Sequence, residues 1–208
     1  MDTTTFAICF CNASKSVADC RDELCRLDTG IGDGDHGITA ERGFLAAADL
    51  SEKFDGVIGD LFLQVGKAMG QKMGGAIGPV YSAFFTGAAS AFESNDDVVE
   101  PVTLALAVKA GVEKVIRIGQ VREGDKTVVD AMGPCARAMA EAQGKDLSYV
   151  VNAGAKAAIM GRDATRDMVA RKGRARFLGE RSKGHIDAGA ASFTIFMQAL
   201  AKEISLRG

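Results

Sequence analysis

The chain has 208 residues, of which 47 % are hydrophobic, and this is enough apolar material for a well-buried core. Its formal net charge of −2 argues against a dedicated nucleic-acid-binding protein, because such domains usually carry a strong basic excess. No segment reaches the roughly 18 consecutive apolar residues that a membrane span requires. We therefore expect neither a nucleic acid nor a membrane among its partners.

The cysteine content bears on the cellular compartment. There are five cysteines, an odd number, and none forms a C-x-x-C pair. Four of them lie within the first 25 residues; the full set is Cys9, Cys11, Cys20, Cys25 and Cys135. This usage is typical of reduced thiols and not of a disulfide framework, so we predict a cytoplasmic protein.

Apolar residues recur at spacings of three and four along most of the chain, whereas period-two alternation is scarce. The pattern predicts an all-α protein, and because no Ser- or Pro-rich linker divides it, we expect a single domain over residues 1–208. The predicted helices span about 14–27, 38–50, 56–73, 79–93, 101–118, 127–143, 147–170 and 189–206. Eight helices are therefore expected.

Local signals support several of these helices. Pro101 follows the polar residues 94–97 and suits the first position of a helix, where a missing N–H has no cost. Thr127, with Asp130 three residues later, resembles a capping box closed by a shorter acid. Small residues in the segments 86–91 and 153–158 would let neighbouring helix backbones approach closely, as in a compact bundle.

Four glycine-bearing loops separate the predicted helices and carry most of the unusual residues. They cover residues 28–37, 73–79, 119–127 and 171–189. Polar loops at helix ends are ordinary, but loops this rich in Asp, Gly, Arg and His favour a functional site.

The first loop contains the spacing Gly32-x-Gly34-x-x-Gly37, which is typical of dinucleotide binding. That fingerprint requires a preceding strand within a βαβ unit, and residues 18–26 have a helical pattern instead. The sequence therefore argues against a Rossmann site.

Two other ligand-binding motifs are also incomplete in this sequence. The segment 119–127 approaches a Walker A sequence, but Asp125 interrupts it and a predicted helix precedes it. A calcium-binding EF-hand loop that started at Asp33 would require an oxygen ligand, a glycine and a glutamate at three set positions. Those positions hold Gly37, Ile38 and Phe44.

Three carboxylates, those of Asp28, Asp33 and Asp35, fall within eight residues on a glycine-rich turn. Two such charges about 5 Å apart repel each other by about 3 kcal/mol at an effective dielectric constant near 20, so a converging set requires a cation. Oxygen ligands of this kind suit Mg²⁺ or Ca²⁺. Two Mg²⁺ ions would change the local charge from −3 to about +1 and attract a polyphosphate. The alternative is that these aspartates only form turns and helix N-caps.

The remaining loops are consistent with phosphate binding but have simpler explanations as well. Residues 74–79 offer backbone N–H groups at a helix start, or they form a plain helix–helix turn. The basic run 171–176, continued by Arg181 and Lys183, suits phosphate, a solvated face or a nucleic-acid patch. His36 and His185 are either phosphate donors or satisfied loop residues.

Taken together, four motifs resemble the nucleotide-binding L subunit, or L domain, of dihydroxyacetone kinases. They are LDTGIGDGDHG at 27–37, GGAIGP at 74–79, GDKT at 124–127, and ARKGRA with LGERSKGH over 170–185. The resemblance covers roughly residues 22 to 206. It implies a closed barrel of eight antiparallel helices with an Mg-nucleotide site at one end.

The resemblance also implies a set of site residues. Asp28, Asp33 and Asp35 would hold two Mg²⁺ ions that bridge the phosphates of ADP or ATP. Arg174 would reach the nucleotide as the catalytic residue. The other nucleotide-binding residues would be His36, Gly37, Ile38 and Thr39 at the phosphates, Ala76 and Ile77 on the second glycine loop, Gly119 and Val128 beside the base, and Asp187, Ala188 and Gly189 closing the pocket. Ile77 stands where a serine is usual in this family, and Ala188 where a proline is usual.

The implied activity is phosphoryl transfer to dihydroxyacetone, or a related short ketose, held covalently through a histidine on a separate K subunit. Positioning and charge neutralisation can drive this reaction without a protein nucleophile. Two modes stay open: exchangeable ATP, or tightly held ADP that a phosphohistidine protein of the sugar phosphotransferase system rephosphorylates. A homodimer stays open as well. The rival hypotheses are an ADP-loaded regulatory module that binds a transcription factor, and the nucleotide domain of a fatty-acid kinase.

Overall fold

The computed structural model describes residues 1–93 and 97–208, which are helical apart from their loops and an isolated bridge between Asp2 and Val98. The α-helices are α1 (Thr3–Asp19), α2 (Arg21–Thr29), α3 (His36–Glu52), α4 (Ile58–Lys72), α5 (Ile77–Ala88), α6 (Pro101–Gly119), α7 (Val129–Ala142), α8 (Leu147–Ala164) and α9 (Ala188–Arg207). Three 3-10 segments accompany them: η1 (Ala89–Ala91), η2 (Thr165–Asp167) and η3 (Arg174–Ser182). The all-α prediction is confirmed. Most of the polar stretch predicted before Pro101, residues 94–96, lies outside the described residues.

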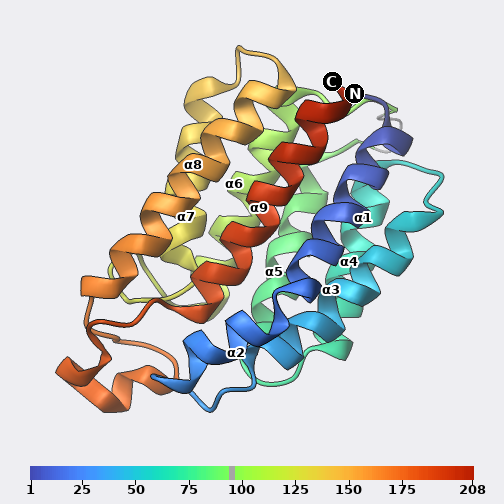
Figure 1. Ribbon diagram of the computed structural model, residues 1–208. Coiled ribbons are helices and arrows are strands. Elements are labelled where there is room, and N and C mark those ends of the chain that lie inside the picture. The colour runs from blue at the N-terminus through green and yellow to red at the C-terminus, as the bar shows by residue number, and fades with distance from the viewer. Residues whose placement is uncertain (94–96) are drawn as a thin grey trace.

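The long helices form a bundle in which successive helices run in opposite directions (Figure 1). Helix α1 packs on α3, each later helix packs on the next, and α9 packs back on α1. Helices α3, α5, α7 and α9 begin at one end, which also carries α2 and η3. We call this the α2 end, and its loops are 30–35, 73–76, 120–128 and 168–187. The opposite end, with the loop residues 53–57, 92–93, 97–100 and 143–146, is the far end.

The predicted helix over 14–27 is wrong, because the structure places two helices there. Helix α1 already begins at Thr3, where the Asp2 side chain accepts a hydrogen bond from the Thr5 N–H at 2.7 Å. The chain then breaks at Cys20, and the nine-residue α2 follows. Because α2 is an additional short helix, the described residues contain nine α-helices where eight were expected.

The predicted helix over 147–170 is wrong at its end. Helix α8 stops at Ala164, and the Thr165 hydroxyl donates to the Arg162 carbonyl at 2.6 Å. A 3-10 turn follows, after which Met168 has extended backbone angles. A threonine hydroxyl that bonds to the preceding turn competes with helix continuation, and this effect is not visible in hydrophobic periodicity.

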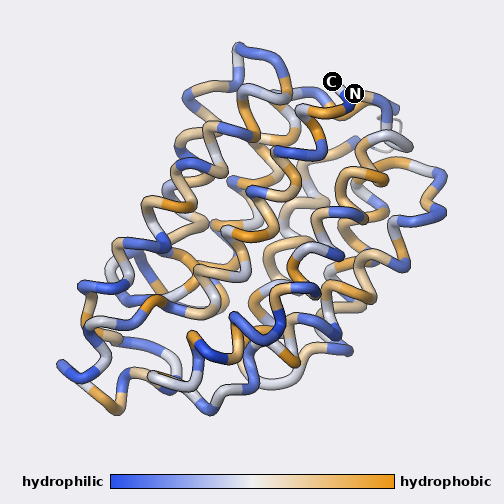
Figure 2. The backbone as a smooth tube through the Cα atoms, in the orientation of Figure 1, coloured by the Kyte–Doolittle hydropathy of each residue, from blue (hydrophilic) through white to orange (hydrophobic). Residues whose placement is uncertain are grey.

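Aromatic rings contributed by several helices pack together in the core. The centroid of the Phe10 ring of α1 lies 5.1 Å from that of Phe196 on α9 and 5.6 Å from that of Phe62 on α4. The rings of Phe44 and Tyr81 join α3 to α5 at 5.1 Å. Figure 2 shows apolar residues recurring along the helices in alternation with hydrophilic ones. Among the described residues, no helix combines the length and the apolar character needed to cross a membrane.

Small residues allow close helix contacts, as expected. A Cβ atom added to Gly87 of α5 would lie 2.9 Å from the Ala110 carbonyl oxygen of α6. In the other direction, a Cβ on Gly111 would lie 2.7 Å from the Phe84 carbonyl oxygen. Both distances are too short for a real side chain, so glycine at these two positions permits the close spacing of α5 and α6.

Candidate functional site

The four glycine-bearing loops identified in the sequence lie at the same end of the bundle, the α2 end (Figure 1). Their backbone is unusual. Among the described residues, every one with a positive φ angle lies in these loops: Gly34, Gly75, Gln120, Gly124, Lys126, Gly173, Gly179 and Gly184. Such angles favour glycine because a side chain collides with the backbone in this region. The glycines therefore serve the shape of the loops.

The first loop brings the three predicted aspartates together. Asp28 lies in the last turn of α2, and Asp33 and Asp35 lie in the loop that leads to α3. Each can offer a carboxylate oxygen within 4.8 Å of the other two. The carboxylate of Asp28 also accepts hydrogen bonds from the backbone N–H groups of Gly34 at 2.9 Å and His36 at 3.3 Å. The loop is therefore folded around Asp28, and the convergence of the three acids follows from local bonds.

Charge and ligand chemistry make this cluster a candidate cation site. Asp28 is half-buried, while Asp33 and Asp35 are exposed, so an ion and its waters could approach. The Arg174 guanidinium forms an ion pair with Asp33, so one cation faces three carboxylates and a formal charge of −2 remains. Hard oxygen donors of this kind suit Mg²⁺ or Ca²⁺. The donor set therefore fits the predicted metal.

A buried polar network lies next to the acid cluster. The His36 imidazole, at the start of α3, lies with its Nε2 atom 3.0 Å from the Ser192 hydroxyl of α9. The Tyr81 hydroxyl of α5 lies 3.0 Å from the same serine oxygen. Burial lowers the pKa of His36 to about 4, so its ring is neutral near pH 7. The His36 side chain thus points into the bundle, and its backbone N–H donates to the Asp28 carboxylate.

The starts of α3 and α5 lie at this end, and neither is capped by the side chain of its own N-cap residue, Asp35 or Ala76. The predicted phosphate-binding residues lie there: Gly37, Ile38 and Thr39 in the first turn of α3, and Ala76 and Ile77 where α5 begins. Gly75, just before α5, has φ +65° and open space around its Cβ position. Backbone N–H groups and the positive end of the helix dipole favour anions at such positions.

The basic segment also reaches the acid cluster. We call residues 166–184, between α8 and the residues before α9, the strap; it contains η3 and Arg174. Besides the ion pair from Arg174 to Asp33, the His185 ring just after the strap lies against Gly30, where an added Cβ would be 2.5 Å from its Nδ1 atom. The strap and the residue that follows it thus contact the loop of the acid cluster in two places.

The residues predicted beside the base lie at the same end. Val128 precedes α7 and Gly119 ends α6, while Asp187 caps α9 by accepting a hydrogen bond from the Ala190 N–H at 2.8 Å. A Cβ added to Gly189 would lie 3.3 Å from the Val128 Cβ, so the starts of α7 and α9 are in close contact. Burial raises the pKa of Asp187 to about 6. Ala188, the residue after this cap, is buried as well.

The GDKT loop is organised by Asp130. One oxygen of this buried carboxylate accepts from the Gly124 N–H at 2.5 Å and the other from the Thr127 N–H at 2.7 Å. The acid half of the predicted capping box is therefore confirmed. The Thr127 hydroxyl accepts from the Val129 N–H at 3.3 Å, one residue earlier than in a standard box.

Sequence reasoning missed four buried polar residues that connect these loops: Tyr81, Lys126, Thr165 and Ser192. Lys126 belongs to the GDKT motif, yet nothing in the sequence indicated that its side chain would be only 2 % exposed. Burial lowers the pKa of its ammonium group. A sequence signal existed only for Lys126, as the one basic residue in a motif otherwise made of turn formers.

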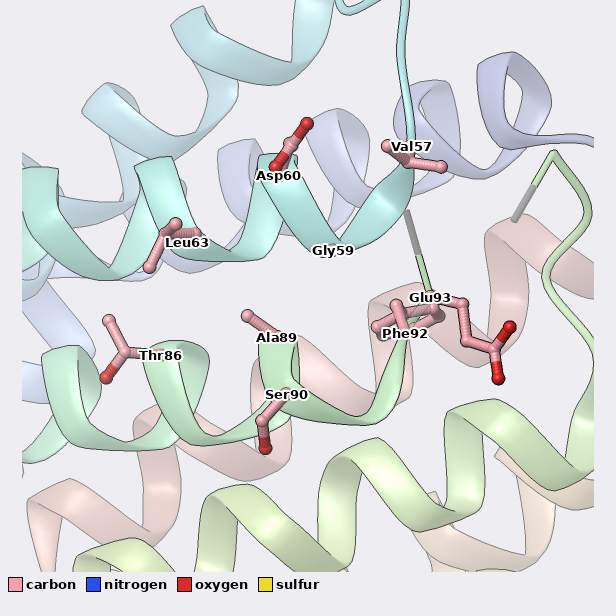
Figure 3. A pocket seen from close by; sticks show the side chains of 9 residues that line it. All are labelled: Val57, Gly59, Asp60, Leu63, Thr86, Ala89, Ser90, Phe92 and Glu93. Carbon is pink, nitrogen blue, oxygen red and sulfur yellow. The ribbon is translucent and has the colours of Figure 1, made fainter. Parts of the chain in front are cut away.

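A cavity lies at the far end, and none of the predicted motifs line it. It has a volume of about 350 Å³ and lies between the start of α4 and the end of α5 (Figure 3). Its walls include Val57, Leu63, Thr86 and Phe92. Because none of the four glycine-bearing loops and none of the three converging acids line it, the α2 end remains the candidate site.

Comparison with known proteins identifies the family. The sequence pattern of the DAK2 domain matches residues 30–202, which is most of the chain. The chain belongs to the DAK2 domain family. The matched range includes Asp33, Asp35 and Arg174, and it begins just after Asp28.

Curated relatives within this family are kinases or kinase subunits. The chain is 36 % identical over 178 residues to the "PEP-dependent dihydroxyacetone kinase 1, ADP-binding subunit DhaL" of Listeria innocua, a match that covers 85 % of this chain and 84 % of that subunit. It is also 36 % identical to the corresponding DhaL subunit of Escherichia coli, over 86 % of each chain. A third relative, the "L-erythrulose 1-kinase" of Mycolicibacterium smegmatis, is 35 % identical over 90 % of this chain but only 33 % of its own length.

The solved structures that resemble this chain also include a dihydroxyacetone kinase. The native dihydroxyacetone kinase of C. freundii superposes with a TM-score of 0.75 at 26 % identity, covering 95 % of this chain and 34 % of that one. The same kinase in complex with AMP-PNP and Mg²⁺ gives a TM-score of 0.72 at 27 % identity, covering 94 % of this chain and 33 % of the kinase. The chain therefore spans about a third of the longer kinases and most of the DhaL subunits.

Proposed function

We propose that this chain is the nucleotide-binding phosphotransferase subunit of a kinase for dihydroxyacetone or a related short ketose. The observation that carries the proposal is the convergence of Asp28, Asp33 and Asp35 at the end of the bundle where the starts of α3 and α5 lack side-chain caps. Its relatives support it, because two are named ADP-binding subunits of dihydroxyacetone kinases and a third is an erythrulose kinase.

The three aspartates would hold two Mg²⁺ ions between them and the phosphates of ADP or ATP. Bound Mg²⁺ would neutralise phosphate charge and fix the orientation of the phosphate oxygens. The protein contributes a prearranged ligand set, since the hydrogen bonds from Gly34 and His36 hold the Asp28 carboxylate in place before any ligand binds. The solved relative that contains AMP-PNP and Mg²⁺ supports this assignment.

Other residues would bind and orient the nucleotide. In the first turn of α3, the backbone N–H groups of Gly37 and Ile38 would contact phosphate oxygens, with His36 and Thr39 beside them, and Ala76 and Ile77 would do the same at the start of α5. The base would lie beside Gly119 and Val128, with Asp187, Ala188 and Gly189 closing the pocket. Arg174 would stabilise the negative charge on the transferred phosphoryl group, as a cationic side chain near the acid cluster can do.

The bundle would act as one domain over residues 1–208, built as a closed barrel of eight long antiparallel helices with α2 added at the site. The contact of α9 with α1 supports a closed arrangement. The barrel suits the function because alternate helices present four N-terminal ends to the same site, where their dipoles favour an anion.

The acceptor ketose would be held by a separate K subunit. In favour of this, the chain aligns with 84 % and 86 % of two DhaL subunits, which are parts of multi-subunit kinases by name. Two of these relatives are PEP-dependent and a third, from Lactococcus lactis, is PTS-dependent, which favours a tightly held ADP rephosphorylated by a phosphohistidine carrier. Exchangeable ATP, a homodimer and a cytoplasmic location stay predictions.

Substitution of one predicted ligand tests the metal assignment. Asp33→Ala should abolish Mg²⁺-dependent ADP binding, measured by calorimetry with and without EDTA, while circular dichroism shows an unchanged helix content. Asp146→Ala is a matched control, because this aspartate caps α8 at the far end. Undiminished nucleotide binding by the Asp33 variant would overturn the metal assignment.

An activity assay separates the proposed function from its rivals. Formation of dihydroxyacetone phosphate should require the chain, a candidate K subunit and a phosphoryl donor, either ATP or the phosphohistidine carrier. A regulatory module that binds a transcription factor would bind ADP in the same pocket but transfer no phosphoryl group. The nucleotide domain of a fatty-acid kinase would transfer to a fatty acid instead. No ketose phosphorylation with any partner and donor would contradict the kinase proposal.

A further inference from the structure

The two ends of the strap are held together at its base by several hydrogen bonds. The backbone N–H of Gly184, its last residue, donates to the carbonyl of Arg166, its first, at 2.8 Å. Just outside these two residues, the Asp187 N–H donates to the Thr165 hydroxyl at 3.0 Å. The strap is therefore a closed loop between α8 and α9.

A single side chain from another loop lies at this base. The Lys126 ammonium group donates hydrogen bonds to the carbonyl oxygens of Thr165 and His185, one on each side of the strap. Its neighbour reinforces the contact, because the Asp125 carbonyl accepts from the Arg171 N–H within the strap at 3.0 Å. The GDKT loop, which lies between α6 and α7, is thus hydrogen-bonded to the strap and to the residues at both of its ends.

Burying the Lys126 ammonium group has a free-energy cost that its surroundings must compensate. The side chain is 2 % exposed, and a buried ammonium group is costly unless its donors and its charge are compensated. The two carbonyls satisfy two of its three donors, and the carboxylates of Asp187 and Asp130 provide nearby negative charge. Its backbone also has φ +60°, a strained value for a non-glycine residue that persists only where surrounding contacts enforce it.

Two residues connect the base of the strap, where Lys126 binds, to the acid cluster. His185, whose carbonyl Lys126 holds, lies with its ring against Gly30 of the metal-binding loop. Arg174, in the middle of the strap, pairs with Asp33. The hydrogen bonds of the Lys126 ammonium group go to the base of the strap and not to the acids, so its effect on the site passes through these two residues.

We propose that Lys126 is a positioning residue: it fastens the strap at its base and thereby places Arg174 and His185 against the metal-binding loop. This inference rests on the proposed function only in assigning a catalytic consequence to the position of Arg174. The fastening itself is a property of the unliganded protein and can be tested without any reaction.

The first test measures the strap directly by limited trypsin digestion followed by mass spectrometry. The strap offers exposed cleavage sites, among them Arg171, Arg174 and Arg181. Lys126→Met removes both hydrogen bonds at nearly constant volume, so cleavage in the strap should become at least about tenfold faster, with other sites unchanged. Lys126→Gln keeps a hydrogen-bond donor on a shorter side chain, so strap cleavage should occur at an intermediate rate. This variant can be used for the same measurement if the Met variant does not fold.

A matched control is provided by Lys114→Met. Lys114 is half-buried on α6 and donates to the Thr86 hydroxyl of α5 at 2.9 Å, away from the strap. This variant should leave the cleavage rate of the strap at the wild-type value. Unchanged strap cleavage in both Lys126 variants, or equal acceleration in the Lys114 variant, would overturn the inference.

A double-mutant cycle tests whether Lys126 acts through Arg174. In the complete phosphotransfer assay, Lys126→Met and Arg174→Ala should each lower kcat, while the double variant should be less than about threefold slower than Arg174→Ala alone. A purely structural role would instead multiply the two losses, and that outcome would refute positioning through Arg174. If the wild-type protein transfers no phosphoryl group, the proposed function fails while the cleavage result still decides whether Lys126 fastens the strap.

Discussion

The two ends of the bundle use their aspartates differently. At the far end, α1 and α8 are each capped by their own aspartate, with Asp2 accepting from the Thr5 N–H and Asp146 from the Tyr149 N–H. At the α2 end, Asp187 caps α9 in the same way, but Asp28, Asp33 and Asp35 face one another. An aspartate that caps a helix has its charge offset by backbone N–H groups, whereas three converging carboxylates require a cation.

The backbone shows the same contrast. All positive φ angles among the described residues belong to the loops and the strap at the α2 end, and the far-end turns at 53–57 and 143–146 contain none. Helix starts alone do not distinguish the ends, because α4 at the far end lacks a side-chain cap just as α3 and α5 do. What marks the α2 end is the combination of uncapped starts with glycine loops and converging acids.

After the loss of Asp33 itself, the largest expected effect comes from adding one methyl group at the α2 end. A Cβ on Gly32 would overlap the Asp28 carboxylate, so Gly32→Ala should displace this proposed ligand and weaken Mg²⁺-dependent ADP binding by about 10- to 100-fold. The matched far-end change is Gly144→Ala, where nothing lies within 4 Å of the new atom. Calorimetric titration of both variants checks this, and equal affinities would contradict the expected difference between the ends.

Two helix caps, one at each end, should respond to pH in opposite directions. Burial raises the pKa of Asp187 to about 6, so between about pH 4 and pH 6 the folded protein holds a proton that the unfolded chain has released. The contribution of this group to the free energy of unfolding therefore falls as the pH rises through that window. Asp2 is the reverse: hydrogen bonds from Thr5 lower its pKa, and its contribution is lost as the pH falls below about 4.

Melting temperatures measured without divalent cations from pH 3 to pH 7 can distinguish the pH dependence that each cap contributes to stability. Relative to wild type, Asp187→Asn should gain stability as the pH rises from 4 to 6, by about 1–2 kcal/mol or a few degrees in Tm. Asp2→Asn should lose stability relative to wild type as the pH rises through 4. Parallel slopes for the two variants would contradict the assignment of these pKa shifts.

The smallest effect is expected for a far-end cap. Asp146→Ala removes a 2.8 Å hydrogen bond to the Tyr149 N–H and should lower the free energy of unfolding by about 1 kcal/mol. Chemical denaturation measures this loss. Because α8 begins away from the candidate site, Mg²⁺-dependent ADP affinity should stay at the wild-type value, and a substantial loss of affinity would show that the two ends are coupled.

Local features of the candidate site were predictable, and long-range ones were not. The loop around Asp28 lies within a few residues in sequence, and its hydrogen bonds to Gly34 and His36 are local. The inward direction of the His36 ring toward Ser192, 156 residues away, required the fold. Even some local features of the fold escaped prediction, because the break at Cys20 and the end of α8 leave no trace in hydrophobic periodicity.

The sequence by itself determined the helical class, the glycine loops and the acid triad, because helix periodicity and turn chemistry act between residues close along the chain. Only the tertiary structure decided which loops meet. It placed Arg174 on Asp33, His185 on Gly30 and the Lys126 ammonium group between two carbonyls of a distant segment. These contacts follow from the packing of α8 and α9 against their neighbours, which brings together residues that no local pattern relates.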